Sequence, residues 1–177
     1  RKIFIFFLTR FLKINPTKYW SIHRVNSRIF KSRKESLNHF EWRNSQYPGY
    51  IELMPVNIFD NKTVLDYGCG PGNDLVGFSE FSDVKKLIGV DVAEPSLKLA
   101  KKRLHHHKKN VCLIKIDENS VKIPLPNNCV DHIHSSGVLH HCKNLDLILE
   151  EFKRILKPSG QINIMVYNYY SIWVHLY

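Results

Sequence analysis

Three glycines alternate with other residues at Gly68, Gly70 and Gly72, directly after a short run of strand-forming residues and before a helical stretch. Glycine lets the backbone turn tightly and approach a ligand with no Cβ in the way. A dinucleotide-binding loop would carry its third glycine at position 73, and that residue is Asn73. The loop therefore predicts a nucleotide-type ligand and argues against a nicotinamide dehydrogenase.

Acidic and hydroxyl side chains stand where the strand-like runs end. Asp91 lies 23 residues after Gly68, where an acidic side chain can accept hydrogen bonds from both hydroxyls of a ribose. Asp66, Asp117 and Ser135 close three other strand-like runs. Each of these residues, taken alone, could instead cap a helix. Because the carboxyl ends of parallel strands face one crevice, we expect all four side chains on a common rim.

Strands and helices alternate from residue 62 onward. The expected strands are 63–66, 86–90, 111–116, 130–135 and 161–167, and the expected helices are 74–81, 95–104 and 145–156. A turn at Lys157-Pro158-Ser159-Gly160 is expected to end the last helix. This alternation predicts an α/β fold, a Rossmann-like, doubly wound and mostly parallel sheet.

The N-terminal third has a different pattern. Residues 1–60 place apolar positions at mixed spacing, with Asn15-Pro16 and Pro48-Gly49 as breakers, which predicts three or four short helices. We therefore expect an N-terminal helical lid over residues 1–60 and a ligand-binding core over residues 61–177.

Composition places the chain among folded globular domains. Its 177 residues are 44% apolar and 24% charged, which argues for one domain and against disorder. The net charge is +10, and 11 of the 26 Lys and Arg residues lie in residues 1–60. The basic residues from Arg24 to Lys34 are expected to form a solvated face, with phosphate or an anionic membrane surface as the alternative partner. The apolar run Ile3–Leu8 is too short to span a bilayer.

The four cysteines predict free thiols. They stand at positions 69, 112, 129 and 142, without a C-x-x-C pair and without the dense spacing of a disulfide scaffold. A reducing compartment follows, so we expect a cytoplasmic protein. His140, His141 and Cys142 are adjacent, but no further ligand shows the spacing of a zinc site, and no metal is expected.

Taken in order, the motifs resemble those of class I S-adenosylmethionine-dependent methyltransferases, above all the small-molecule branch that includes quinone-biosynthesis methyltransferases. The resemblance covers about residues 60–167 and rests on the segments Val64–Gly72, Gly89–Asp91, Ile116–Asp117, Ser136–His141 and Glu151–Gly160. It implies S-adenosylmethionine as the cofactor and a methyl group transferred to a small-molecule or lipid-like acceptor.

The resemblance also implies a place for each motif. The glycine loop would lie against the methionine part of the cofactor with Asp66 near its amino group, Asp91 would hold the ribose, and Asp117 with Glu118 would meet the adenine. The cofactor-binding residues expected on this basis are Asp66, Tyr67, Gly68, Cys69, Gly70, Pro71, Gly72, Asp91, Val92, Asp117, Glu118, Ser135, Ser136 and Gly137.

Methyl transfer from a sulfonium is an in-line displacement, so alignment and exclusion of water are the main tasks of the protein. A hydroxyl or phenol acceptor would gain from a base, and His140 and His141 follow the strand 130–135, where a base could reach. Structural packing is the alternative role for this pair. Aromatic residues of the N-terminal segment, Trp20 among them, could close over the cofactor or simply pack the helices onto the sheet.

The resemblance implies a seven-stranded sheet, and this chain offers five of the seven strands. We therefore expect a fragment cut at both ends, in which 161–167 is an edge strand followed by an apolar tail. Such an edge predicts self-association. The apolar tail residues are Tyr169, Tyr170, Ile172, Trp173 and Leu176.

Two other functions stay open from the sequence. An RNA methyltransferase could use the basic N-terminal segment, and salt-dependent RNA binding would support it. A binding module could keep the cofactor pocket without turnover, and cofactor affinity with no methylated product would support that function.

Overall fold

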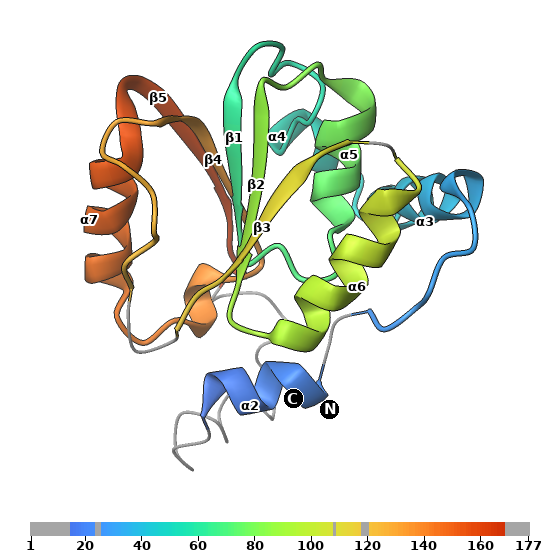
Figure 1. Ribbon diagram of the computed structural model, residues 1–177, viewed down its shortest axis with the longest axis horizontal. Helices are drawn as coiled ribbons and strands as arrows, with labels where there is room; N and C mark the ends of the chain where they lie inside the picture. Colours follow the sequence, from blue (N-terminus) through green and yellow to red (C-terminus); the bar gives the residue numbers. More distant parts are fainter. Residues whose placement is uncertain (1–14, 24–25, 108, 118–120, 169–177) are drawn as a thin grey trace.

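The computed structural model describes residues 15–23, 26–107, 109–117 and 121–168. The described chain forms one five-stranded sheet in the order β3-β2-β1-β4-β5, and every neighbouring pair of strands is parallel (Figure 1). The strands are β1 (Thr63–Tyr67), β2 (Lys86–Asp91), β3 (Val111–Lys115), β4 (Val130–Ser136) and β5 (Leu156–Met165). The predicted Rossmann-like α/β fold is confirmed.

Helices cover both faces of this sheet. Figure 1 shows α3, α5 and α6 on one face and α7 on the other, while α2 lies apart, near the carboxyl ends of the strands. The helices are α2 (Pro16–Ile22), α3 (Arg33–Ser45), α4 (Tyr50–Leu53), α5 (Asn73–Phe81), α6 (Glu94–His105) and α7 (Leu145–Ile155), with a 3-10 turn η1 (Leu139–His141). A loop without a described helix joins β3 to β4.

The last strand begins earlier than the sequence indicated, at Leu156 instead of Gln161. Leu156 pairs with Val130 and Gln161 with His132, so the register shifts between these two pairs. The Lys157–Gly160 segment, expected as a turn after the helix, is therefore an irregularity inside β5. A strand can contain a proline and a glycine at such an irregularity, because the extra residues of a bulge do not need to form hydrogen bonds with the neighbouring strand.

Alternation along β1 divides the core into two layers. Val64 and Leu65 are adjacent and both fully buried, but they belong to different hydrophobic clusters on the two faces of the sheet. Val64 packs in the layer under α5 and α6, and Leu65 packs with Phe152 of α7 in the other. Central strands covered on both faces are buried throughout, as β1 is.

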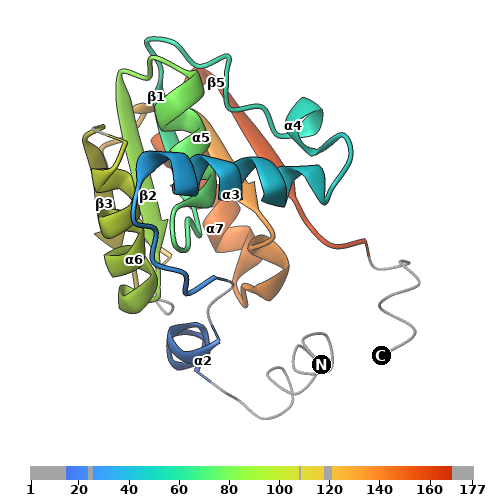
Figure 2. The same ribbon diagram turned by 90° about the vertical axis from the view of Figure 1, so that its right-hand side faces the viewer.

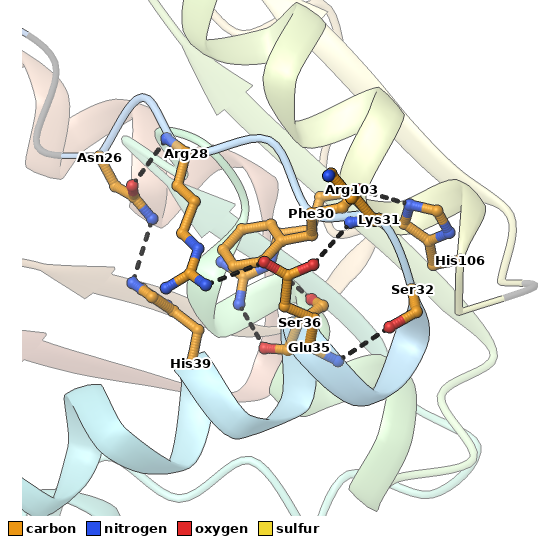
Figure 3. A network of polar contacts seen from close by, with 10 residues as sticks. All are labelled: Asn26, Arg28, Phe30, Lys31, Ser32, Glu35, Ser36, His39, Arg103 and His106. Atoms are coloured by element: carbon orange, nitrogen blue, oxygen red, sulfur yellow. Dashed lines mark hydrogen bonds and ion pairs between the residues drawn. The ribbon is translucent and has the colours of Figure 1, made fainter.

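Helix α3 is fastened to the rest of the molecule by apolar and polar contacts. Phe40 of α3 and Val56 belong to the same buried cluster as α5 and α6, and Figure 2 shows α3 running across the front of α5. In Figure 3, Arg103 of α6 reaches into this region, where its Nε donates to Ser36 Oγ at 2.7 Å. Its guanidinium also lies 4.4 Å from the ring centre of Phe30.

Strand β5 is an edge strand within the described residues, since it pairs there with β4 alone. Ile164, Val166 and Tyr167 are exposed on it or just after it. The five apolar tail residues named above, from Tyr169 to Leu176, lie outside the described part of the chain. Among the described residues, no helix has the length and apolar character needed to cross a membrane.

Candidate functional site

A cavity of about 180 Å³ opens at the carboxyl ends of the strands. Residues that follow β1, β2, β3 and β4 line it, together with one side chain of α2 and the start of α7. They are Trp20, Tyr67, Gly68, Gly70, Pro71, Asp91, Val92, Ser96, Ile116, Asp117, Val121, Ser136, Gly137, Val138, His141, Cys142, Lys143, Asn144 and Ile148. Of the four side chains expected on a common rim, Asp91 and Asp117 line this cavity, and Asp66 and Ser135 do not.

The glycine loop adopts the left-handed backbone that favours glycine. Gly68 and Gly70 have φ values of 76° and 52°. A Cβ on Gly68 would lie 2.4 Å from Val138 Cγ2, whereas a Cβ on Gly70 would meet nothing within 4 Å. Gly68 thus makes room for a neighbouring side chain, and Gly70 leaves open space at the cavity wall.

Asp91 holds the loop in this conformation. Its Oδ2 accepts a hydrogen bond from the backbone N–H of Gly70 at 2.8 Å, and its Oδ1 accepts one from Ala93 at 2.7 Å. Burial raises the pKa of Asp91, while the hydrogen bonds from backbone N–H groups work in the opposite direction. Each carboxylate oxygen keeps a further lone pair for a ligand hydroxyl.

Five of the residues predicted for the site do not line the described cavity wall: Asp66, Cys69, Gly72, Ser135 and His140. Ser135 is fully buried and donates from Oγ to the carbonyl of Tyr67 at 3.1 Å, which joins β4 to β1 beneath the loop. Gly72 packs against Ala100 of α6. Glu118 lies outside the described residues.

Asp66 belongs to a buried charged cluster under the glycine loop. The cluster consists of Arg43, Asp66, Asp74 and His134, which come from α3, β1, α5 and β4. Arg43 Nη1 forms an ion pair with Asp74 Oδ1 at 3.0 Å, and His134 Nε2 lies 3.4 Å from Asp74 Oδ2. Asp66 and Asp74 are 3% and 7% exposed.

The two carboxyl groups of the cluster respond differently to burial. Burial raises the pKa of Asp66 to about 7, although His134 counteracts it. Burial works the same way on Asp74, but the hydrogen bond to His134 and the charge of Arg43 outweigh it and bring its pKa below the usual value. Asp74 is therefore the charged carboxylate of the pair at neutral pH. Asp66, with a pKa of about 7, is present in both its protonated and its deprotonated form at that pH.

Aromatic rings gather at the side of the cavity nearest α2. Trp20 and His141 both line the cavity, and their ring centres are 5.0 Å apart. The ring centre of His140 lies 4.0 Å from that of His141 and 4.3 Å from that of Tyr167, with the rings tilted in both pairs. Burial lowers the pKa of His140, and burial with the neighbouring His140 lowers the pKa of His141 to about 4. Both imidazoles are neutral at pH 7.

Several residues that matter to this geometry have no clear signal in the sequence. Arg43 and Asp74 belong to no motif, because a polar residue on a helix looks the same whether it faces solvent or a buried cluster. Tyr50 was expected only as one of the N-terminal aromatic residues that could close over the cofactor or pack the helices onto the sheet. Val138 and Cys142 were read only as neighbours of the histidines. His134, a titratable residue inside a predicted strand, was a weak signal for the cluster, because the same strand also carries Asp131 and His132.

Comparison with known proteins assigns the family. The family model described as "Methyltransferase domain" matches residues 65–164. The chain belongs to the class I S-adenosylmethionine-dependent methyltransferases. It is 32% identical over 127 residues to an uncharacterised methyltransferase of Schizosaccharomyces pombe, covering 68% of this chain and 45% of that protein. It is 30% identical over 157 residues to the demethylmenaquinone methyltransferase of Listeria welshimeri, covering 84% of this chain and 63% of that protein.

A solved methyltransferase has the same fold. The S-adenosylmethionine-dependent methyltransferase of Aquifex aeolicus is 31% identical, with a TM-score of 0.53 over 67% of this chain and 66% of that one. The chain spans between 30% and 63% of the length of the first four curated relatives that it matches.

The residues of this methyltransferase chain fit S-adenosylmethionine. The open space at Gly70 is a cradle that any side chain would fill, and Asp91 beside it has lone pairs to spare for ribose hydroxyls. Ile116, Val121 and Ile148, which belong to or pack against one hydrophobic cluster, give part of the cavity an apolar lining suited to the planar adenine ring. In the part of the chain that the structure describes, no group of three or more His, Cys, Asp or Glu side chains is arranged to hold a metal ion.

Proposed function

We propose that this chain binds S-adenosylmethionine in the cavity and transfers its methyl group to an uncharged small-molecule or lipid-like acceptor. The observation that supports it best is the joint placement of Asp91 and the open glycine loop at the carboxyl ends of β2 and β1. When bound, the cofactor supplies an electrophilic methyl group on a sulfonium.

The chain's own residues would hold both the nucleoside part and the methionine part of the cofactor. Asp91 would accept hydrogen bonds from the ribose hydroxyls, with Val92 beside it, and Asp117 would lie at the adenine end. The backbone of Gly68–Gly72 would face the methionine part. Asp66 would lie near the amino group, beneath the loop, and would carry a negative charge in its deprotonated form. Gly137 would border the same part of the cavity from the end of β4.

The acceptor would enter at the aromatic side of the cavity. Trp20, Val138 and Cys142 line this side without a formal charge, since burial raises the pKa of the Cys142 thiol to about 11. These uncharged side chains favour a neutral acceptor, because a charged one would lose its hydration beside them without a partner, and the Lys143 side chain that also lines the cavity is exposed. The name of the Listeria welshimeri relative points to demethylmenaquinone, an acceptor of that character.

A base is needed only for an acceptor that must lose a proton. His140 and His141 stand near the aromatic side and are neutral, so either could accept one. The low pKa of His141 makes it a weak base, because a general base works best with a pKa near the operating pH. His141 is the one of the two that lines the cavity, so it is the better placed candidate for a base, and His140 would support it from behind.

Two measurements test this function. Calorimetric titration with S-adenosylhomocysteine should show saturable binding, with NAD⁺ as the control ligand that should not bind. Labelled S-adenosylmethionine, supplied with the chain and separate lipid, small-molecule and RNA extracts, should place the label in the lipid or small-molecule fraction. Label in RNA would replace the proposed acceptor, and binding without any labelled product would indicate a module without turnover.

A further inference from the structure

The hydroxyl of Tyr50 connects the N-terminal helices to the cavity. Tyr50 begins α4 and is 7% exposed. Its phenolic oxygen lies 2.9 Å from Oγ of Ser136, which lines the cavity, and 3.3 Å from Oδ2 of Asp74. Tyr50 and Ser136 are 86 residues apart in the sequence, so this contact joins two distant elements.

Tyr50 itself is held from two sides. The guanidinium of Arg43 lies 4.4 Å from its ring centre, and the same guanidinium is ion-paired with Asp74. Burial and the charge of Asp74 raise the pKa of Tyr50, so the hydroxyl keeps its proton at any physiological pH. A buried, doubly supported phenol has little freedom, and the Ser136 hydroxyl is fixed along with it.

The strand order shows which part of a ligand this contact affects. Across the sheet, β3, β2, β1 and β4 follow one another, so Asp117, Asp91, Gly68 and Ser136 lie in that order along the cavity. With adenine at Asp117 and ribose at Asp91, Ser136 stands at the opposite end, where the amino-acid part of the cofactor must lie.

We propose that Tyr50 is a positioning residue for the amino-acid end of S-adenosylmethionine, acting through Ser136 from outside the cavity. The inference rests on the proposed function. It makes α3 and α4 determinants of affinity for the amino-acid part of the cofactor, and leaves the nucleoside part to the ends of β2 and β3.

Two ligands separate this role from a general structural one. S-adenosylhomocysteine carries the amino-acid part, and 5′-methylthioadenosine lacks it. In calorimetric titrations, Tyr50→Phe should weaken S-adenosylhomocysteine roughly three- to tenfold, the effect of one neutral hydrogen bond, and leave 5′-methylthioadenosine within about twofold. Tyr47→Phe is the matched control, because Tyr47 is exposed and its ring centre lies 6.5 Å from that of Tyr50. It should change neither constant.

A second variant tests the path through Ser136. Ser136→Ala should show the same selective loss, and the double variant Tyr50→Phe/Ser136→Ala should lose little more than either single one. Equal weakening of both ligands by Tyr50→Phe would mean that Tyr50 only supports the fold. Unchanged binding of both would mean that Ser136 needs no support, and additive losses would mean that the residues act separately. Wild-type chain that binds neither ligand would overturn the proposed function and this inference with it.

Discussion

Asp91 and Gly70 form a single structural unit, in which the carboxylate at the end of β2 accepts the backbone N–H of the loop that follows β1, at 2.8 Å. The second oxygen of the same carboxylate accepts the N–H of Ala93, at the start of α6. One side chain therefore sets the loop, begins a helix and faces the cavity. In the proposed function, ligand affinity and local structure depend on the same two oxygens.

Asp91→Ala should therefore affect both binding and stability. Loss of the charge-assisted hydrogen bonds to the ribose should weaken S-adenosylhomocysteine at least about tenfold in a calorimetric titration. Two backbone N–H groups also lose their acceptor, which should lower the free energy of unfolding by about 1–3 kcal/mol in urea. Asp146→Ala, at an exposed position of α7, is the control and should change neither quantity. An unaltered dissociation constant in Asp91→Ala would rule out the ribose role.

Gly70→Val should abolish cofactor binding while the fold persists. The side chain meets no protein atom within 4 Å of its Cβ, so it projects into the space proposed for the methionine part. The positive φ adds some strain, which a branched residue tolerates poorly. Far-ultraviolet circular dichroism close to that of the parent, together with lost binding of S-adenosylhomocysteine, is the expected pair of results. Normal binding would show that the loop is only a turn.

Most of the fold could be predicted from local patterns in the sequence. The short runs around Val64 and Ile133 predicted strands, and Gly68-x-Gly70-x-Gly72 marked the turn that follows the first of them. The irregular start of β5 was missed because proline and glycine at 158 and 160 normally end an element, and only pairing with β4 shows that the strand continues through them.

The candidate site also contains some residues that could be predicted from the sequence and others that could not. Asp91 and Asp117 could be predicted from their positions after strands, because parallel topology brings those positions together. Tyr50 could not, because its role depends on a contact with Ser136, 86 residues away, which no local pattern encodes. The buried partners of Asp74 depend likewise on how α3 docks, and docking is a tertiary property.

His132 should make the fold sensitive to acid. It is 1% exposed and stacks on Phe59 with ring centres 4.2 Å apart. Burial, with a contribution from His134, lowers its pKa from 6.5 to about 4. Below pH 6.5 the unfolded chain binds a proton that the folded chain does not, so stability falls as the pH drops toward 4, by about 3 kcal/mol for this group.

Urea unfolding between pH 4.5 and 7 measures this effect. His132→Leu places an apolar side chain of similar volume in the core and should reduce the decline over that range, while His141, whose pKa is also about 4, still contributes to it. His105→Leu, at an exposed position near the end of α6, is the matched control for replacing a histidine with leucine outside the core. Parallel profiles for the parent and His132→Leu would contradict the assignment of the decline to this residue.

Ser36→Ala should destabilise the fold through the contacts that hold α3 to α6, with cofactor binding left intact. Ser36 is fully buried, and its Oγ accepts from Arg103 Nε at 2.7 Å and lies 2.9 Å from Nε2 of His107. Arg103 is 2% exposed, and burial lowers its pKa to about 10. Removing the hydroxyl leaves a buried charged donor without this acceptor, which costs about 1.5–3 kcal/mol of stability.

Urea unfolding should show that loss of stability in Ser36→Ala. Ser45→Ala, at an exposed end of the same helix, should stay within about 0.5 kcal/mol of the parent. Ser36, Ser45 and Arg103 do not line the described cavity. The dissociation constant for S-adenosylhomocysteine, measured without urea, should therefore match that of the parent in Ser36→Ala and in Ser45→Ala. Equal unfolding midpoints for Ser36→Ala and the parent would show that Arg103 is held by its remaining contacts, the carbonyl of Ser36 and the ring of Phe30.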